Sequence, residues 1–370
     1  MKTDYSIVAQ LTDCCNLNCT YCYLDKARPK RNMDLKTVER LISEVHGYND
    51  AFAHFAWVGG EPLLRSDGFL EQIIETGKAC NTKGLDISHS IQTNGIELTE
   101  DRQKRLRAMG YRLGGSFDGC LDVQKKQRVN RTGQDKTETI IRNYEACRRE
   151  IGLIAVLTNN LVGREIEAYE NLRRLCTTAR INFFAPSGGG LLAKDELLPS
   201  VENATSSFLE FYRLWKSDDS DFNLNPFSSI VRGFFTGWVK TCDYSAYSCT
   251  RLLGVDPDGG VFLCSRSTHM PETKLGNINE ISLKEMIGNR VHQKIMDRYF
   301  DLKEGDCGGC NWFSICSGGC PIEAKSLSGD FNQKTYYCET KKTLFRKISE
   351  DLNDDDNVKR FLRKTKIGGN

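Results

Sequence analysis

Short apolar runs alternate with amphipathic stretches through the first 216 residues. The runs at 52–58, 85–91, 111–116, 152–158 and 180–186, together with one that ends near residue 11, have the length of strands. Between them apolar residues recur at helical spacing, as at Leu35, Val38, Leu41, Ile42 and Val45. Six strand–helix units predict a parallel sheet covered by helices. Because six units are too few for a full eight-stranded barrel, the expected fold class is α/β, a partial (β/α)6 TIM-like barrel.

The second half of the chain differs in amino-acid composition. From residue 217 it is rich in Ser, Gly, Asp and Cys, and the DPDGG segment at 256–260 predicts a hairpin turn. Helices are expected at 282–300 and 335–352. We therefore expect a barrel over 1–216, a cysteine-rich domain over 217–350 and a charged, flexible tail over 351–370.

Polar and glycine-rich segments follow the first four predicted strands directly. They are CCNLNCTYC at 14–22, GGEP at 59–62, QTNG at 92–95 and SFDG at 116–119. Active sites of parallel α/β folds gather at the carboxyl ends of the strands. The four segments therefore predict one shared site.

Composition narrows the class of protein. With 51 basic and 49 acidic side chains the net charge is +2, which argues against nucleic-acid or membrane binding as the main purpose. No apolar run approaches the roughly 18–20 residues of a membrane span, and no signal sequence begins the chain, so a cytoplasmic protein is expected. Sixteen cysteines are unusual in a cytoplasmic protein unless they bind metal. Four are scattered singly, and the other twelve lie in three groups.

The first of these groups contains Cys15, Cys19 and Cys22, with the spacing C-x3-C-x2-C. A structural zinc site normally has four protein ligands, and no nearby histidine supplies the fourth. A 4Fe–4S cluster held by three thiolates keeps one iron open for another ligand. The spacing therefore favours a cluster that binds a substrate or cofactor.

This motif resembles the hallmark of the radical S-adenosylmethionine (SAM) superfamily, C-x3-C-x-aromatic-C, with Tyr21 as the aromatic residue. The resemblance implies that the open iron binds SAM, and that an electron from the cluster cleaves SAM to a 5′-deoxyadenosyl radical that abstracts hydrogen from a substrate. Turn chemistry and a solvated surface charge are the alternative explanations for Ser116 and Arg128. The SAM contacts implied by the resemblance are Tyr21, Gly59, Gly60, Glu61, Pro62, Asn94, Ser116 and Arg128.

The carboxyl-terminal cysteines resemble the seven-cysteine pattern of the SPASM domain, an extension of radical SAM enzymes that act on peptides and proteins. They form C-x9-G-x4-C, then C-x2-C-x5-C-x3-C, then a single cysteine, and Cys242 adds an eighth thiol. Taken alone, this half also fits a pair of zinc ribbons. The resemblance implies two auxiliary 4Fe–4S clusters, one on Cys242, Cys249, Cys264 and Cys320 and one on Cys307, Cys310, Cys316 and Cys338.

Two kinds of enzyme share this resemblance. Anaerobic sulfatase-maturating enzymes, which form formylglycine, carry an Asp general base after the cysteine of the G-x4-C segment, where this chain has Ser265. They commonly carry Pro where this chain has Cys120. We therefore expect an oxidoreductase that installs an oxidative crosslink in a ribosomally made precursor peptide. Sulfatase maturation and peptide epimerisation are the alternatives, and no general base is assigned.

The expected partners follow from this function. They are the precursor peptide and an external electron donor such as flavodoxin or ferredoxin. No winged-helix domain is evident, so leader recognition is assigned to the core surface or to a separate leader-binding protein. A carrier of three clusters without chemistry is the alternative class, and the incomplete ligation by Cys15, Cys19 and Cys22 argues against it.

Overall fold

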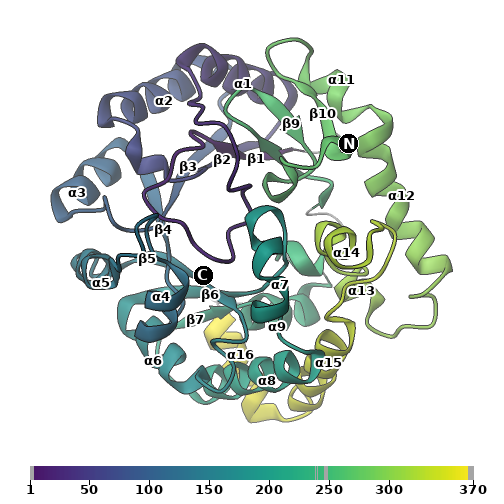
Figure 1. Cartoon of the computed structure of the whole chain (residues 1–370). Coiled ribbons are helices and arrows are strands. Elements are labelled where there is room, and N and C mark those ends of the chain that lie inside the picture. Colours follow the sequence, from purple (N-terminus) through teal and green to yellow (C-terminus); the bar gives the residue numbers. More distant parts are fainter. Residues whose placement is uncertain (1–3, 238, 240, 246–248, 366–370) are drawn as a thin grey trace.

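A curved sheet of ten strands forms the centre of the computed structural model, which describes residues 4–237, 239, 241–245 and 249–365 (Figure 1). Strands β1 to β6 follow one another in chain order, and every neighbouring pair among them is parallel. The predicted partial α/β barrel is therefore confirmed. These six strands are β1 (Ser6–Gln10), β2 (Phe52–Val58), β3 (Asp86–Thr93), β4 (Tyr111–Ser116), β5 (Arg149–Leu157) and β6 (Cys176–Phe183).

Helices cover the outer face of this sheet (Figure 1). Several begin at a capping side chain that accepts a backbone N–H of the first turn, as Asp34, Ser66, Thr99 and Ser200 do. The helices of this half are α1 (Leu35–Tyr48), α2 (Asp67–Cys80), α3 (Glu100–Met109), α4 (Leu121–Gln127), α5 (Thr137–Ala146), α6 (Glu165–Leu175), α7 (Lys194–Leu197) and α8 (Val201–Ser217), with 3-10 turns η1 (Pro62–Leu64) and η2 (Gly188–Ala193).

The two faces of the sheet differ in burial. On β2, Phe55 and Trp57 are fully buried against the helices, whereas His54, Ala56 and Val58 are only partly buried. Successive strand residues point to opposite faces, so the second set faces the inside of the barrel. Small and polar residues on this inner face leave it accessible to solvent.

The second half of the chain extends the same sheet at both edges. β8 (Leu252–Val255) pairs in parallel with β1, and β7 (Asn223–Asn225) pairs in parallel with β6. β9 (Gly260–Phe262) and β10 (Lys274–Asn277) continue beyond β8 as antiparallel neighbours. The predicted hairpin at 256–260 is confirmed, because Asp256 accepts the Gly260 backbone N–H at the turn between β8 and β9.

The remaining helices pack around this extension. The segment 282–300, expected as one helix, forms two, because Asn289 caps the second helix and interrupts the first. The remaining elements are α9 (Phe227–Thr236), η3 (Cys242–Tyr244), η4 (Ser265–Ser267), η5 (Pro271–Thr273), α11 (Leu283–Ile287), α12 (Arg290–Glu304), α13 (Phe313–Cys316), α14 (Pro321–Ser328), α15 (Cys338–Asp351) and α16 (Asp355–Thr365).

Helix α16 lies within the segment expected to be a flexible tail. Phe361 is fully buried and stacks on Trp215 with 5.9 Å between the ring centroids. The charges of this segment hid an apolar stripe at helical spacing, formed by Val358, Phe361 and Leu362. Residues 366–370 lie outside the described residues. Within the described part of the chain, no helix has the length and apolar character needed to cross a membrane.

Gly254 of β8 fixes how the two halves meet. A Cβ atom at this position would lie 2.3 Å from the backbone nitrogen of Ser265 in η4. We expect Gly254→Ala to lower the free energy of unfolding by about 1–3 kcal/mol, because rigid backbone must move. Gly47→Ala, where nothing lies within 4 Å, is the control and should be neutral or stabilising in the same urea titration. Equal stabilities for both variants would contradict this packing.

Candidate active site at the carboxyl ends of the strands

The loop after β1, residues 11–32, crosses the mouth of the barrel and carries Cys15, Cys19 and Cys22 (Figure 1). We call it the cluster loop. Backbone hydrogen bonds fix it to three other segments, which are the loop after β2, the end of α4 and the η2 turn after β6. The Gly60 N–H donates to the carbonyl of Thr12 at 2.7 Å, and the Thr20 N–H donates to that of Gln127 at 2.9 Å. A third comes from the rim loop after β6, whose residue 190 donates to the carbonyl of Cys22 at 2.7 Å.

The GGEP segment meets the cluster loop at unusually short range. A Cβ atom on Gly60 would lie 2.1 Å from the carbonyl oxygen of Cys14, and one on Gly59 would lie 2.4 Å from that of Thr12. Gly59 also has a φ of 136°, which L side chains rarely adopt. These glycines therefore allow the close approach of the cluster loop, and the SAM contact that the resemblance implies for them stays a prediction. Pro62 follows as the first residue of η1.

Glu61 is fully buried and accepts three hydrogen bonds. Its carboxylate accepts the Thr93 hydroxyl at 2.7 Å, the Asn94 N–H at 2.7 Å and the Leu63 N–H at 3.0 Å. Burial raises the pKa of Glu61, and these donors act against that rise. The carboxylate thus joins the loop after β2 to the loop after β3, and it positions Asn94.

Asn94 reaches the cluster loop as expected. Its side-chain amide donates to Asn16 at 2.7 Å and lies 3.8 Å from the sulfur of Cys15. Ser116, at the end of β4, accepts a hydrogen bond from Gln92 at 3.2 Å. Its backbone N–H donates to the Tyr144 hydroxyl at 3.0 Å. The four polar segments therefore do meet at one edge of the sheet.

A buried network of Tyr21, Asp118 and Arg128 lies beside Cys19. The Tyr21 hydroxyl donates to Asp118 at 2.9 Å and accepts from the Arg128 guanidinium at 2.7 Å. Arg128 is only 5% exposed, so the alternative of a solvated surface charge is wrong. Its Nε has no partner among the described residues. Asp118 belongs to the SFDG segment, but no sequence pattern predicts that it anchors this network.

The cysteines of the cluster loop are themselves partly buried. Burial raises the pKa of Cys15 to about 11 and that of Cys19 to about 12, although Arg128 acts to lower the latter. Thiols with such pKa values are protonated near neutral pH. Metal binding to this loop must therefore displace protons.

Two cavities in the second half are each lined by four cysteines. The first four-cysteine cavity also contains Arg266, whose guanidinium lies 2.9 Å from the sulfur of Cys320. The second also contains Lys334, Lys341 and Lys342. The thiols of the first belong to Cys242, Cys249, Cys264 and Cys320, and those of the second to Cys307, Cys310, Cys316 and Cys338. The structure thus assembles the two sets that the resemblance implied, and their binding of iron stays a prediction.

The donor sets suit clusters better than single ions. Among the described residues, no three His, Cys, Asp or Glu side chains lie close enough to hold one metal ion. A tetrahedral zinc would hold its thiolates ~4 Å apart. Each thiolate of a 4Fe–4S cluster binds a different iron and stands farther from the others. Four thiols spread around a cavity therefore fit a cluster.

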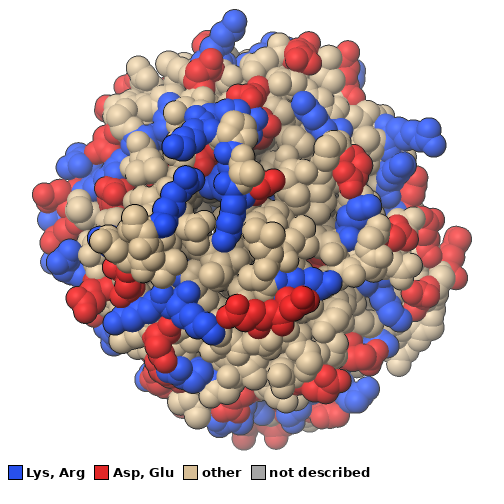
Figure 2. All heavy atoms as spheres, viewed as in Figure 1, with Lys and Arg blue, Asp and Glu red and all other residues tan. Residues whose placement is uncertain are grey.

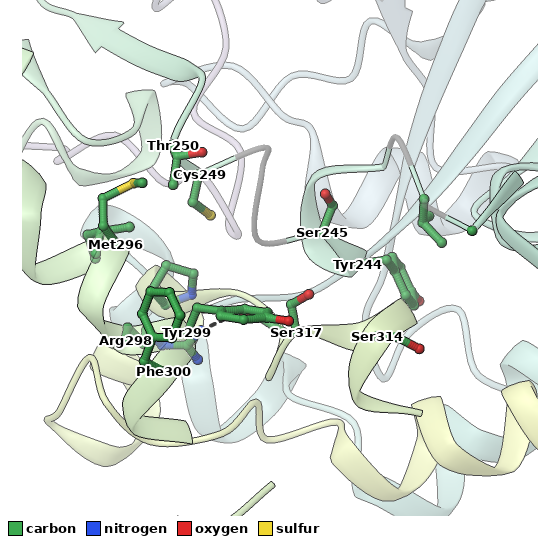
Figure 3. A pocket seen from close by; sticks show the side chains of 15 residues that line it. Tyr244, Ser245, Cys249, Thr250, Met296, Arg298, Tyr299, Phe300, Ser314 and Ser317 are labelled. Atoms are coloured by element: carbon green, nitrogen blue, oxygen red, sulfur yellow. Dashed lines mark hydrogen bonds between the residues drawn. The ribbon is translucent and has the colours of Figure 1, made fainter. Parts of the chain in front are cut away.

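A wider cleft opens next to the first four-cysteine cavity, between α12 and η3. Figure 3 shows Met296, Tyr299 and Phe300 on one side of it, with Tyr244 and Ser314 on the other. Cys249 lies on its wall, whereas none of the three cysteines of the cluster loop does. This cleft is therefore separate from the candidate active site.

Charge on the face that carries the cluster loop is mixed. Figure 2 shows Lys and Arg side chains gathered near the centre of this face, with both signs around its rim. Within the cluster loop, Arg31 pairs with Asp13 at 2.6 Å and with Asp258 of the β8–β9 turn at 2.7 Å. The two halves of the chain are thus also linked by ion pairs at the mouth of the barrel.

Comparison with known proteins agrees with this architecture. The model of the radical SAM superfamily matches residues 10–177, and that of SPASM, an iron–sulfur cluster-binding domain, matches residues 247–311. The chain therefore contains a radical SAM domain and a SPASM domain over these residues. The cofactors of these domains are SAM and 4Fe–4S clusters.

Individual relatives are similar over nearly the whole chain. The cysteine-type anaerobic sulfatase-maturating enzyme of Clostridium perfringens (strain 13 / Type A) is 26% identical over 345 residues, covering 90% of this chain and 92% of that protein. The PqqA peptide cyclase of Granulibacter bethesdensis is 26% identical over 345 residues, covering 88% and 84%. The structure of anSMEcpe with bound AdoMet superposes with a TM-score of 0.84 at 22% identity, covering 95% and 99%.

The buried carboxylate of Glu61 gives a direct test of how this site is held. We expect Glu61→Gln to lower the free energy of unfolding by about 1–3 kcal/mol, because an amide N–H₂ would face a backbone donor. Glu71→Gln on the exposed side of α2 is the matched control and should change little. Urea unfolding measures both. Similar values for the two variants would refute the role of Glu61.

Proposed function

We propose that this chain is a radical SAM enzyme that oxidises a side chain of a peptide substrate, with three 4Fe–4S clusters. The observation that carries this proposal is the division of the thiols, three in the C-x3-C-x2-C motif of the cluster loop and four around each cavity. Only the set of three leaves an iron open. When bound there, the cluster and SAM supply the 5′-deoxyadenosyl radical that abstracts hydrogen.

We assign the SAM contacts to the buried polar groups around the cluster loop. Arg128 offers a guanidinium fork suited to a carboxylate, and its unpartnered Nε needs an acceptor. Tyr21 and Asp118 hold that fork in place beside Cys19. Asn94 and Ser116 border the same site, and backbone carbonyls near Gly59 and Gly60 are the remaining acceptors for the SAM ammonium.

Arg128→Met tests this assignment. We expect at least a tenfold loss of SAM affinity in equilibrium dialysis, because the variant lacks the donors for the SAM carboxylate. Arg131→Met, which changes an exposed arginine nearby, is the control and should bind SAM as the unmodified chain does. Iron content is measured in parallel. Unchanged SAM affinity in an Arg128→Met protein with its full iron content would exclude Arg128 as a SAM contact.

For the reaction, we propose oxidative crosslinking of a ribosomally made precursor peptide. Ser265 supports this choice, because it stands where a carboxylate base is expected in sulfatase maturation. It is 9% exposed, its carbonyl accepts the Gln10 amide at 3.2 Å, and its side chain contacts Tyr23. A hydroxyl so placed is a poor substitute for a carboxylate base.

Formylglycine formation in a sulfatase is the second candidate. The similarity to the Clostridium perfringens enzyme over 90% of the chain favours it. Crosslinking and formylglycine formation both remove two electrons from the substrate, one more than hydrogen abstraction alone. Both therefore need an electron acceptor, and the two four-cysteine sites would supply it. An external flavodoxin or ferredoxin would donate to the cluster loop, and leader recognition belongs to the core surface or a separate protein.

Mass spectrometry after anaerobic incubation with SAM and reductant separates these reactions. The substrates are a short precursor peptide encoded beside the gene and sulfatase-derived peptides containing Cys or Ser. We expect loss of two hydrogens from the precursor, without labelling by an aldehyde-reactive hydrazide. A hydrazide-reactive sulfatase peptide would instead establish the second candidate. An unchanged mass with inverted chirality would establish epimerisation. Failure to release 5′-deoxyadenosine would indicate a protein that carries clusters without cleaving SAM.

Cys338→Ala tests whether the second four-cysteine site takes part. We expect SAM cleavage to persist while peptide oxidation falls at least tenfold, because the substrate electron loses its acceptor. Cys80→Ala, at the end of α2 and outside all three thiol sets, is the control and should oxidise peptide normally. Undiminished oxidation by Cys338→Ala would exclude an electron-accepting role for this site.

A further inference from the structure

Lys341 is a buried lysine of helix α15 that the function above does not use. It lies one turn after Cys338, and only 1% of its surface is exposed. Its ammonium donates to the carbonyl oxygen of Asp243 at 2.6 Å. It also stands over the ring of Tyr244, with Nζ 4.2 Å from the ring centroid. Both contacts hold the nitrogen at one place in the interior.

That place is between the two four-cysteine cavities. Lys341 lines the second cavity together with Cys316 and Cys338. Its hydrogen-bond acceptor, Asp243, directly follows Cys242 of the first cavity. A Cβ atom on residue 319, which precedes a cysteine of the first cavity, would lie 3.2 Å from Nζ.

No carboxylate among the described residues forms an ion pair with this ammonium. The carboxylate of Asp243 faces Arg266 at 3.8 Å and Arg180 at 3.9 Å. Glu323, the other buried acid nearby, accepts from Thr335 and from the backbone N–H of residue 336. A buried charge is costly unless an opposite charge compensates it. Within the protein chain, the acids Asp243 and Glu323 therefore act on Lys341 only at a longer range than a contact ion pair.

We infer that the two auxiliary clusters are the counter-ion of Lys341, and that Lys341 in turn raises their reduction potentials. This inference rests on the ligand sets proposed above. Four thiolates give each cluster a net negative charge, and reduction adds one more. A fixed positive charge between the clusters stabilises the reduced form of both, because net charge and local electrostatics set such potentials. Lys341 thus acts indirectly, because it sets the cluster potentials that decide how readily the clusters accept the electron from the substrate.

Redox titration of the loaded full-length protein, followed by electron paramagnetic resonance, tests this role. We expect Lys341→Met to weaken reduction of the auxiliary clusters at least tenfold, which corresponds to a drop of about 59 mV for one electron. The cluster on Cys15, Cys19 and Cys22 should keep its potential. Lys341→Arg preserves the charge and should restore the auxiliary potentials.

Lys347→Met is the matched control, because it removes one exposed lysine from the same helix, where Lys347 pairs with Asp351. It should leave every potential unchanged. Lys341→Gln replaces Lys341→Met if the latter retains too little iron. Unchanged auxiliary potentials in a fully loaded neutral variant would overturn the inference, as would an equal drop in Lys341→Arg. No peptide is needed, so a wrong substrate assignment does not affect the result, whereas absence of iron would refute the proposed function first.

Discussion

The close backbone contact between the GGEP segment and the cluster loop is the constraint on which the rest of the site depends. Gly60 and Glu61 donate their N–H groups to the carbonyls of Thr12 and Cys14, at 2.7 and 2.8 Å. Only glycine permits this approach, since a Cβ on Gly60 would overlap the Cys14 carbonyl. The contact sets the path of the loop, and with it the directions from which three thiols can reach one cluster.

Buried charge organises both halves of the molecule in different ways. Around the cluster loop, Glu61 is compensated by neutral donors, and Arg128 and Asp118 are bridged by Tyr21. Between the four-cysteine cavities, Lys341 has no contact ion pair among the described residues, and the acids Asp243 and Glu323 act on it only at longer range. In the first arrangement the Nε of Arg128 is left without a partner among the described residues. In the second, the negative clusters proposed for the adjoining cavities would compensate the charge of Lys341.

Much of this architecture could be predicted from the sequence, because its signals are local. Strand and helix periods predicted the six units of the barrel, and the resemblance to the SPASM domain implied which thiols share each cavity. What sequence reasoning missed depends on three-dimensional burial. Nothing local distinguishes Arg128 from an exposed arginine, or the buried Lys341 from its partly exposed neighbour Lys342. The charges around Phe361 likewise hid a residue that packs in the core.

The pairing of β8 with β1 has a mechanical consequence. Four register pairs join these strands, so the cysteine-rich half is part of the barrel sheet itself. Separating the halves would break a central ladder of backbone hydrogen bonds, which a flexible linker would not require. A rigid frame of this kind would hold the proposed cluster sites at constant separations, and the proposed peptide substrate would have to enter the barrel without a hinge opening between the two halves.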